Sequence, residues 1–224
     1  MIQTRSILNA ACVGASLFAL SGCDIAIALV ESDSEFLSEE FLQDAAKAKA
    51  EFLALGPSPT LPTMGTGTYI GFGRIDLADT LYGPSGTQLI GQAQLDATFS
   101  GSGATVGGSV TNFSYRNNTV FAALREALES GDAAQVGTVV DEFKPASGEL
   151  TVTANAITDP LFSADITGSI KTGTESFDFD GATTGQFYGD DAQVIRLTGT
   201  TPNGLTVNDG STDRNAEITI IGAK

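Results

Sequence analysis

Residues 89–99 read LIGQAQLDATF, and every second side chain in this stretch is apolar or absent. A period of two residues is typical of a β-strand, because successive side chains of a strand point to opposite faces. The same alternation occurs in LTVTANA at 150–156 and in FSADITGSIK at 162–171. The three stretches therefore predict strands with one apolar face and one polar face.

Five further stretches carry strand signals, and most neighbouring stretches are joined by short turns rich in Gly, Asp and Asn. They are TYIGFGRIDL (68–77), ATVGGSVTNF (104–113), ESFDFD (175–180), AQVIRLTGT (192–200) and NAEITIIG (215–222). Eight such strands predict an antiparallel β-barrel. The expected fold class is mainly β, an eight-stranded antiparallel soluble β-barrel with an N-terminal helix and a helical insert.

The composition of the two faces indicates which one lies inside the barrel. The apolar face is rich in Gly and Ala, whereas the other carries Gln, Thr, Ser and Asp. The interior of an eight-stranded barrel is just wide enough to be filled by side chains, so small apolar residues suit it. A membrane barrel needs aromatic girdles on an apolar outer face, and the chain has no Trp. We expect Leu95, Phe99, Val152 and Ile166 inside, with no room for a sizeable ligand.

An amphipathic helix is predicted before the strands, at residues 32–55. Ser32 and Glu35 form a capping-box pattern, and Gly56 is a natural stop. The predicted apolar face consists of Leu37, Phe41, Leu42, Ala45, Ala48, Phe52, Leu53 and Leu55. We expect this face to dock on the barrel, and a membrane-surface helix or a partner site are the alternatives. Residues 57–67, PSPTLPTMGTG, predict an extended and fairly stiff linker.

A second helical segment interrupts the strand pattern at residues 117–143. Its apolar side chains at helical spacing are Val120, Leu124 and Leu128. We expect a short helix over one end of the barrel. Because loops and inserts often carry recognition, residues 115–145 and the loop 200–214 are the predicted places for a ligand. Replacing the insert with a short turn is expected to leave the barrel folded and to weaken ligand binding.

The N-terminus predicts export and lipidation. Arg5 is the only charge in residues 1–22, and the apolar run 7–20 is shorter than the roughly 20 residues that span a bilayer. The boundary LSGC at 20–23 resembles the lipobox of bacterial lipoproteins. That resemblance implies that Cys23 receives a diacylglyceryl thioether and that the chain is cut before it and acylated. The alternative is an ordinary secreted protein with a chance cysteine.

Composition excludes several function classes. The 224-residue chain has a net charge of −16 and no His. The acidity argues against a nucleic-acid partner, which needs a basic surface. Without His, Ser–His and Cys–His nucleophile pairs and His-ligated zinc or haem are impossible. No carboxylate pair stands out for acid–base chemistry, so we expect a protein that is not an enzyme and has no cofactor.

Calcium is a candidate ligand because it prefers carboxylate oxygens. The candidate side chains are Asp178, Asp180, Asp190 and Asp191. Their spacing matches no EF-hand loop, so no metal site is predicted. The oxygen-rich stretch 208–217 is most simply a long hairpin loop.

Residues 165–200, DITGSIKTGTESFDFDGATTGQFYGDDAQVIRLTGT, resemble the barrel signature of transferrin-binding protein B and its relatives. In these lipoproteins a strand leads to a G-x-FYG-x-x-A turn and a strand that ends in glycine. The matching positions are Gly185, Phe187, Tyr188, Gly189, Ala192 and Gly199. Residues 95–113 resemble an earlier hairpin of the same barrels. The resemblance implies one barrel lobe at the cell surface, often for the capture of host proteins or haem.

Two departures limit what this resemblance implies. Full transferrin receptors of this kind have two lobes, whereas this chain has room for one barrel, and no segment matches a transferrin-contacting surface. The residues themselves have a structural interpretation. Gly185 and Gly189 suit positive φ in a tight turn, and Phe187 and Tyr188 point to opposite sides.

The expected organisation is a signal peptide at 1–22, a lipidated tether with a helix and Pro-rich linker at 23–64, and a barrel at 65–224. We expect an envelope lipoprotein that binds an unknown protein or small ligand through barrel-end loops. The alternative is a structural lipoprotein that packs against other envelope components. In enteric bacteria an aspartate at the position of Asp24 favours the inner membrane, but the family usually reaches the outer surface. The outer membrane is therefore the predicted location.

Overall fold

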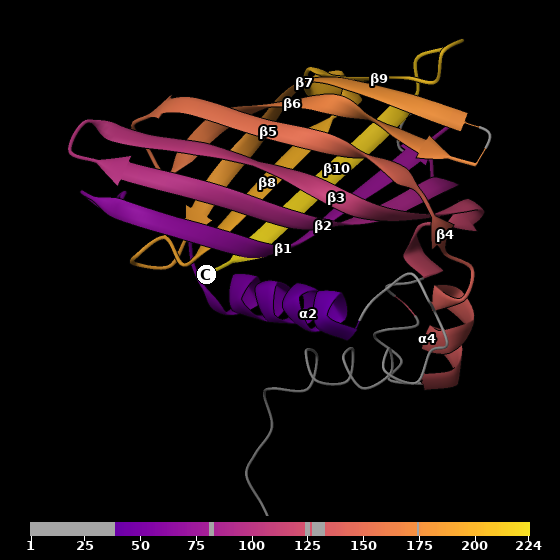
Figure 1. The fold of residues 1–224 in the computed structure, drawn as a ribbon, viewed down its shortest axis with the longest axis horizontal. Helices are drawn as coiled ribbons and strands as arrows, with labels where there is room; N and C mark the ends of the chain where they lie inside the picture. The colour runs from indigo at the N-terminus through magenta and orange to yellow at the C-terminus, as the bar shows by residue number, and fades with distance from the viewer. Residues whose placement is uncertain (1–38, 81–82, 124–125, 127–132, 174) are drawn as a thin grey trace, which may run out of the picture.

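Figure 1 shows the computed structural model, which describes residues 39–80, 83–123, 126, 133–173 and 175–224. Several predictions fall outside the described residues. They concern the signal peptide, Cys23, Asp24, the capping box at Ser32 and Glu35, Leu37, Leu124 and Leu128.

Eight antiparallel strands form a closed barrel (Figure 1). They are β1 (Gly65–Ala78), β2 (Ser85–Ser100), β3 (Gly103–Val120), β5 (Ser147–Ile157), β6 (Leu161–Thr172), β7 (Glu175–Tyr188), β8 (Val194–Thr200) and β10 (Asn215–Ala223). The order around the barrel is β2-β1-β10-β8-β7-β6-β5-β3, and pairing of β3 with β2 closes it. This confirms the predicted fold class. Two short strands were not predicted, β4 (Lys144–Pro145) beside β3 and β9 (Leu205–Asn208) beside β7.

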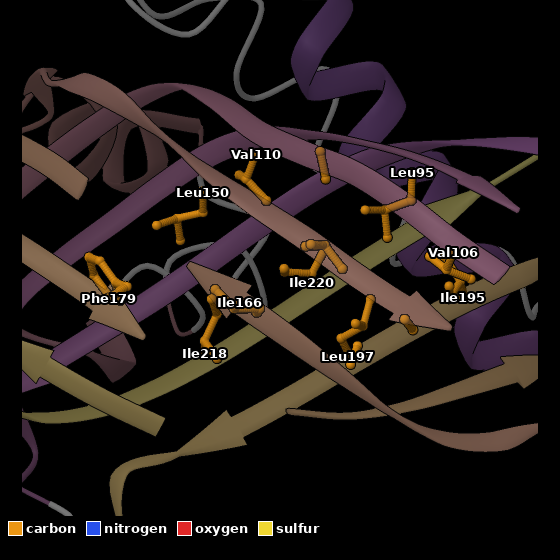
Figure 2. Packing of buried hydrophobic residues seen from close by; sticks show 14 of the residues in the cluster. Leu95, Val106, Val110, Leu150, Ile166, Phe179, Ile195, Leu197, Ile218 and Ile220 are labelled. Atoms are coloured by element: carbon orange, nitrogen blue, oxygen red, sulfur yellow. The ribbon is translucent and has the colours of Figure 1, made fainter. Parts of the chain in front are cut away.

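The apolar face of each strand fills the barrel, as expected. In β2 the residues from 91 to 100 alternate regularly between buried and less buried positions. Leu95, Phe99, Val152 and Ile166 all belong to one buried cluster. Figure 2 shows labelled side chains of this cluster pointing toward one another from different strands. Burying one such aliphatic side chain contributes about 1.5–3 kcal/mol, so the interior is the main source of stability.

Helix α2 (Glu39–Ala54) lies along the outside of the barrel, beside β1, β10 and β8 (Figure 1). The cluster between helix and barrel comprises Ala48, Phe52, Leu55, Phe72, Tyr188, Val194, Ile221 and Ala223. Docking of the predicted helix on the barrel is therefore confirmed. Leu53 was wrongly assigned to the docked face, since its side chain is 62% exposed.

The segment 57–67, predicted as an extended and fairly stiff linker, contacts the barrel near its start, and its last three residues belong to a strand instead. Pro57 forms a β-bridge with Tyr188, and the Ser58 N–H donates to the Phe187 carbonyl at 2.9 Å. Leu61 packs against the barrel core. Residues 65–67 already belong to β1. The chain thus crosses the barrel end and satisfies backbone groups there.

The two signature glycines have different roles. Gly189 has φ 80° in the turn after β7, as predicted. Gly185 was expected in the same turn but lies inside β7. A Cβ there would lie 2.3 Å from the ring of Phe162, so the missing side chain makes room for that ring.

The two signature aromatics point to opposite sides of β7, as predicted. Phe187 is fully buried inside, with its ring 5.5 Å from that of Phe99 and 5.1 Å from that of Phe162. Tyr188 lies outside and meets Phe52 of α2 edge to face at 5.0 Å. One residue pair therefore joins the barrel core to the docked helix.

The insert follows β3 and contains helix α4 (Ala133–Val140), on the same side of the barrel as α2 (Figure 1). A helical insert was predicted, but its start was placed wrongly. Val120 is the last residue of β3 rather than a helical residue. Residues 115–120 and 144–145 belong to strands. Replacing all of 115–145 with a short turn would therefore remove part of the sheet.

Candidate ligand-binding groove

A β-bulge decides which side chains of β3 face outward near the insert. Ile90 pairs with Ser114 and Gln92 with Thr111, so two residues of β3 oppose Gly91. The extra residue is Asn112, whose φ is 53°, a value that Asn tolerates better than most residues. An extra residue reverses the facing of every later side chain in the strand. Without it, the alternation that starts at buried Val110 would direct Arg116 into the barrel.

Arg116 is instead buried between the outer face of the barrel and the insert. Its side chain is 1% exposed. Nε and Nη2 donate to Gln88 Oε1 at 3.0 and 2.8 Å, and Nη2 also donates to the Val120 carbonyl at 3.4 Å. Nη1 donates to Glu142 Oε2 at 3.2 Å, and the guanidinium lies 5.3 Å from the ring centre of Phe143. Burial lowers the pKa of Arg116, and the hydrogen bond with Glu142 opposes that shift.

Gln88 connects this arginine to a buried carboxylate. Its Nε2 donates to Asp76 Oδ1 at 2.8 Å while its Oε1 accepts from Arg116. Asp76 also pairs with Arg74 Nη2 at 3.0 Å. Burial raises the pKa of Asp76, whereas Arg74 and Gln88 lower it. These side chains form a hydrogen-bonded network across β1, β2 and β3 that ends at Glu142 of the insert.

A groove of about 630 Å³ lies between the end of β3 and the insert. Its lining residues are Tyr115, Arg116, Asn117, Thr119, Val120, Ala123, Val139, Glu142 and Lys144. Sites for small molecules typically measure about 300–1,000 Å³ and combine apolar walls with a few polar groups. The groove has this composition, with a buried guanidinium and an exposed amine among its donors.

A second cavity at the same end of the barrel is much smaller, about 50 Å³. It is lined by Asp76, Ala78, Gly83, Phe121, Thr200, Pro202, Asn215, Ala216 and Glu217. Its volume suits only a few water molecules. The predicted recognition loop 200–214 contributes two residues to it.

The rest of that loop is organised by its own side chains. Asp209 accepts from the backbone N–H groups of Ser211 at 3.0 Å and Thr212 at 2.8 Å, and it pairs with Arg214 at 3.4 Å. Hydrogen bonds, the Ser211 hydroxyl first, hold the pKa of Asp209 well below its usual range. This geometry suits the hairpin-loop interpretation of residues 208–217.

The four aspartates that are candidate calcium ligands do not lie together in the structure. Asp178 and Asp180 are exposed on β7, where they pair with β9. Asp190 and Asp191 follow the other end of β7. Among the described residues, no group of three or more His, Cys, Asp or Glu side chains could hold a metal ion.

The predicted recognition range 115–145 contains all the residues that line the groove, but the sequence singled out none of them as a binding residue. Arg116 lies between the strand predicted at 104–113 and the helical segment predicted at 117–143, and Gln88 precedes the stretch 89–99. A lone arginine after a predicted strand was the available signal. The bulge that turns it outward was not visible in the pattern.

Comparisons with known proteins leave the resemblance to the transferrin-binding protein B family as a prediction. No helix within the described part of the chain is both long and apolar enough to cross a bilayer. No protein-family model matches the chain, and the searches of curated proteins and of solved structures found no match either.

Proposed function

We propose that this protein is a lipid-anchored protein of the bacterial envelope, without enzymatic activity, that binds its ligand in the groove between β3 and the insert. The observation that carries the proposal is the groove itself, with buried Arg116 in its wall. The barrel interior is filled by side chains, so a ligand has to bind outside it. The lipobox resemblance at residues 20–23 supports the anchor.

The likeness to transferrin-binding protein B supports a role in capture at the cell surface. Both are lipoproteins in this proposal, and both use an eight-stranded barrel. We assign none of the ligands of that family to this protein. Placement in the outer membrane follows the family, whereas Asp24 favours the inner membrane by the enteric rule.

The anchor is tested by labelling cells with a lipid precursor. Cys23→Ala should abolish the label and release the protein from membranes. Cys12→Ala is the matched control, because the predicted cleavage removes this residue, and it should leave labelling unchanged. A wild-type protein without label would refute the anchor. Density-gradient separation of the two membranes then decides the location, and recovery with the inner membrane would show that Asp24 governs sorting.

Ligand binding is tested by affinity capture with the lipidated protein, followed by identification of what is retained. Ala123→Trp fills the groove and should abolish capture, because the indole occupies the ligand's space. Lys171→Glu changes an exposed residue of β6, outside the groove, and should have no effect. Equal capture by Ala123→Trp and Lys171→Glu would contradict the proposal that the ligand binds in the groove. A protein that retains nothing and resists protease added to intact cells would instead be the structural lipoprotein.

A further inference from the structure

We propose that Arg116 is the anchoring group for a carboxylate on the ligand. In the free protein, the side-chain carboxylate of Glu142 occupies the position of that ligand carboxylate. This inference rests on the proposed groove and names the chemistry that it recognises. The ligand class is a small organic molecule with a carboxylate and a short apolar part.

The first argument is that three of the four hydrogen bonds of the guanidinium are made to the barrel strands. Gln88 accepts from both Nε and Nη2, and the Val120 carbonyl accepts from Nη2. These contacts come from β2 and β3, which belong to the closed sheet. A fixed arginine loses little conformational freedom when it binds an anion, and its planar donors match a carboxylate.

The second argument is that the anion at Nη1 is easily replaced. Glu142 is 54% exposed and reaches Nη1 through Oε2 at 3.2 Å. The buried guanidinium needs an anion, but Glu142 is half in water, so a ligand carboxylate can exchange with it without leaving Arg116 unpaired. Arginine binds a carboxylate best when both oxygens accept in parallel from two nitrogens. The outer N–H of Nη2 has only a long contact, 3.4 Å, with the Val120 carbonyl. A ligand carboxylate that takes this N–H together with Nη1 can therefore displace Glu142, while Gln88 still holds the guanidinium.

The third argument is the composition of the groove around Arg116. Lys144 supplies an exposed cation, and Asn117 and Thr119 supply amide and hydroxyl groups. The apolar part of the wall consists of Val120, Ala123 and Val139. These walls suit a short apolar body beside the carboxylate. The chain as a whole carries −16, so long-range attraction cannot explain anion binding and the contacts at Arg116 have to supply it.

A carboxylate can come from a free organic acid or from the end of a peptide chain, and the volume of the groove favours the free acid. The test titrates the purified full-length protein by calorimetry with three probes. They are glutarate, an acetylated pentapeptide with a free C-terminal carboxylate, and the same pentapeptide with a C-terminal amide. Glutarate binding with a weaker peptide response identifies a free acid. Tighter binding of the free-carboxylate peptide than of its amide identifies a chain end.

Two variants test the roles of the named residues. Glu142→Gln should tighten binding about tenfold, as expected if the internal carboxylate leaves a tenth of the molecules competent. Arg116→Lys keeps the charge but loses the planar donors, and should weaken binding at least about tenfold. Glu149→Gln and Arg196→Lys are the matched controls outside the groove, and both should bind as the wild type does. The NMR signal of Arg116 Nε–H should shift on titration.

Failure to bind any carboxylate probe, in the wild type and in Glu142→Gln, would overturn the inference. The inference would also be overturned if the wild type and Glu142→Gln bound the probe equally well and the NMR signal of Arg116 did not shift. This outcome is decisive even if Arg116→Lys does not fold. The proposed function has a separate outcome. Loss of capture in Ala123→Trp would support the groove even if it accepts no carboxylate.

Discussion

Replacing Gly168 with alanine should destabilise the barrel by about 3 kcal/mol. Gly168 lies in β6 with φ 146°, and a Cβ there would lie 2.1 Å from the Glu149 carbonyl oxygen of β5. A non-glycine residue in such a conformation costs about 1–3 kcal/mol. Displacing the neighbouring backbone costs a similar amount, as overpacking does. The lower entropy of the unfolded chain offsets about 0.4–1 kcal/mol.

Thermal and urea denaturation followed by circular dichroism measure this effect. For a chain of this size about 3 kcal/mol corresponds to a fall of roughly 6–12 °C in Tm. Gly107→Ala is the matched control, because Gly107 is also in a barrel strand but a Cβ there meets nothing within 4 Å. Its Tm should stay within a few degrees of wild type. Equal Tm values for the two variants would refute the argument that β6 and β5 approach too closely for a side chain.

Three further predictions concern the network, the docked helix and a strained residue. Burial raises the pKa of Asp76, so its contribution to stability is complete below its ordinary pKa of about 4 and is lost as the pH rises through the raised value. Urea denaturation should show the wild type losing stability relative to Asp76→Asn as the pH rises above that ordinary value. Phe52→Ala removes the edge-to-face contact with Tyr188 and should cost about 2 kcal/mol by urea denaturation, whereas exposed Leu53→Ala should change stability by less than about 0.5 kcal/mol. Ala156 has φ 55°, so Ala156→Gly should relieve about 1 kcal/mol of backbone strain and raise Tm, and an unchanged or lower Tm would contradict this.

The barrel could be predicted from the sequence because one physical requirement acts on every strand. Each strand has one face in a narrow apolar interior and one in water, so the alternation in 89–99 repeats in most of the others. The helix at 39–54 could be predicted for a related reason, since its apolar face has to be covered. Its docking place could not, because it depends on outward residues such as Tyr188 and Ile221.

Predictions from the local sequence failed where a residue type suits two different structural positions. Gly185 suits a turn, but it also suits a strand position where the ring of Phe162 rests against the backbone. Proline in the segment 57–67 suits a linker, but Pro57 also fits beside Tyr188 at the end of β7. In both cases the partner is distant in sequence, so no window of neighbouring residues contains the deciding contact.

The outward position of Arg116 depends on one extra residue in β3, at the first of two irregularities along its pairing with β2. The bulge at Asn112 moves Arg116 from the interior to the outer face, where Gln88 and Glu142 can reach it. A buried guanidinium needs acceptors and an anion, because burying an unpaired charge is very costly. The barrel supplies the acceptors, while the anion comes from the insert through a half-exposed side chain. In the proposed site, the fixed part therefore lies on the sheet and the exchangeable part on the insert.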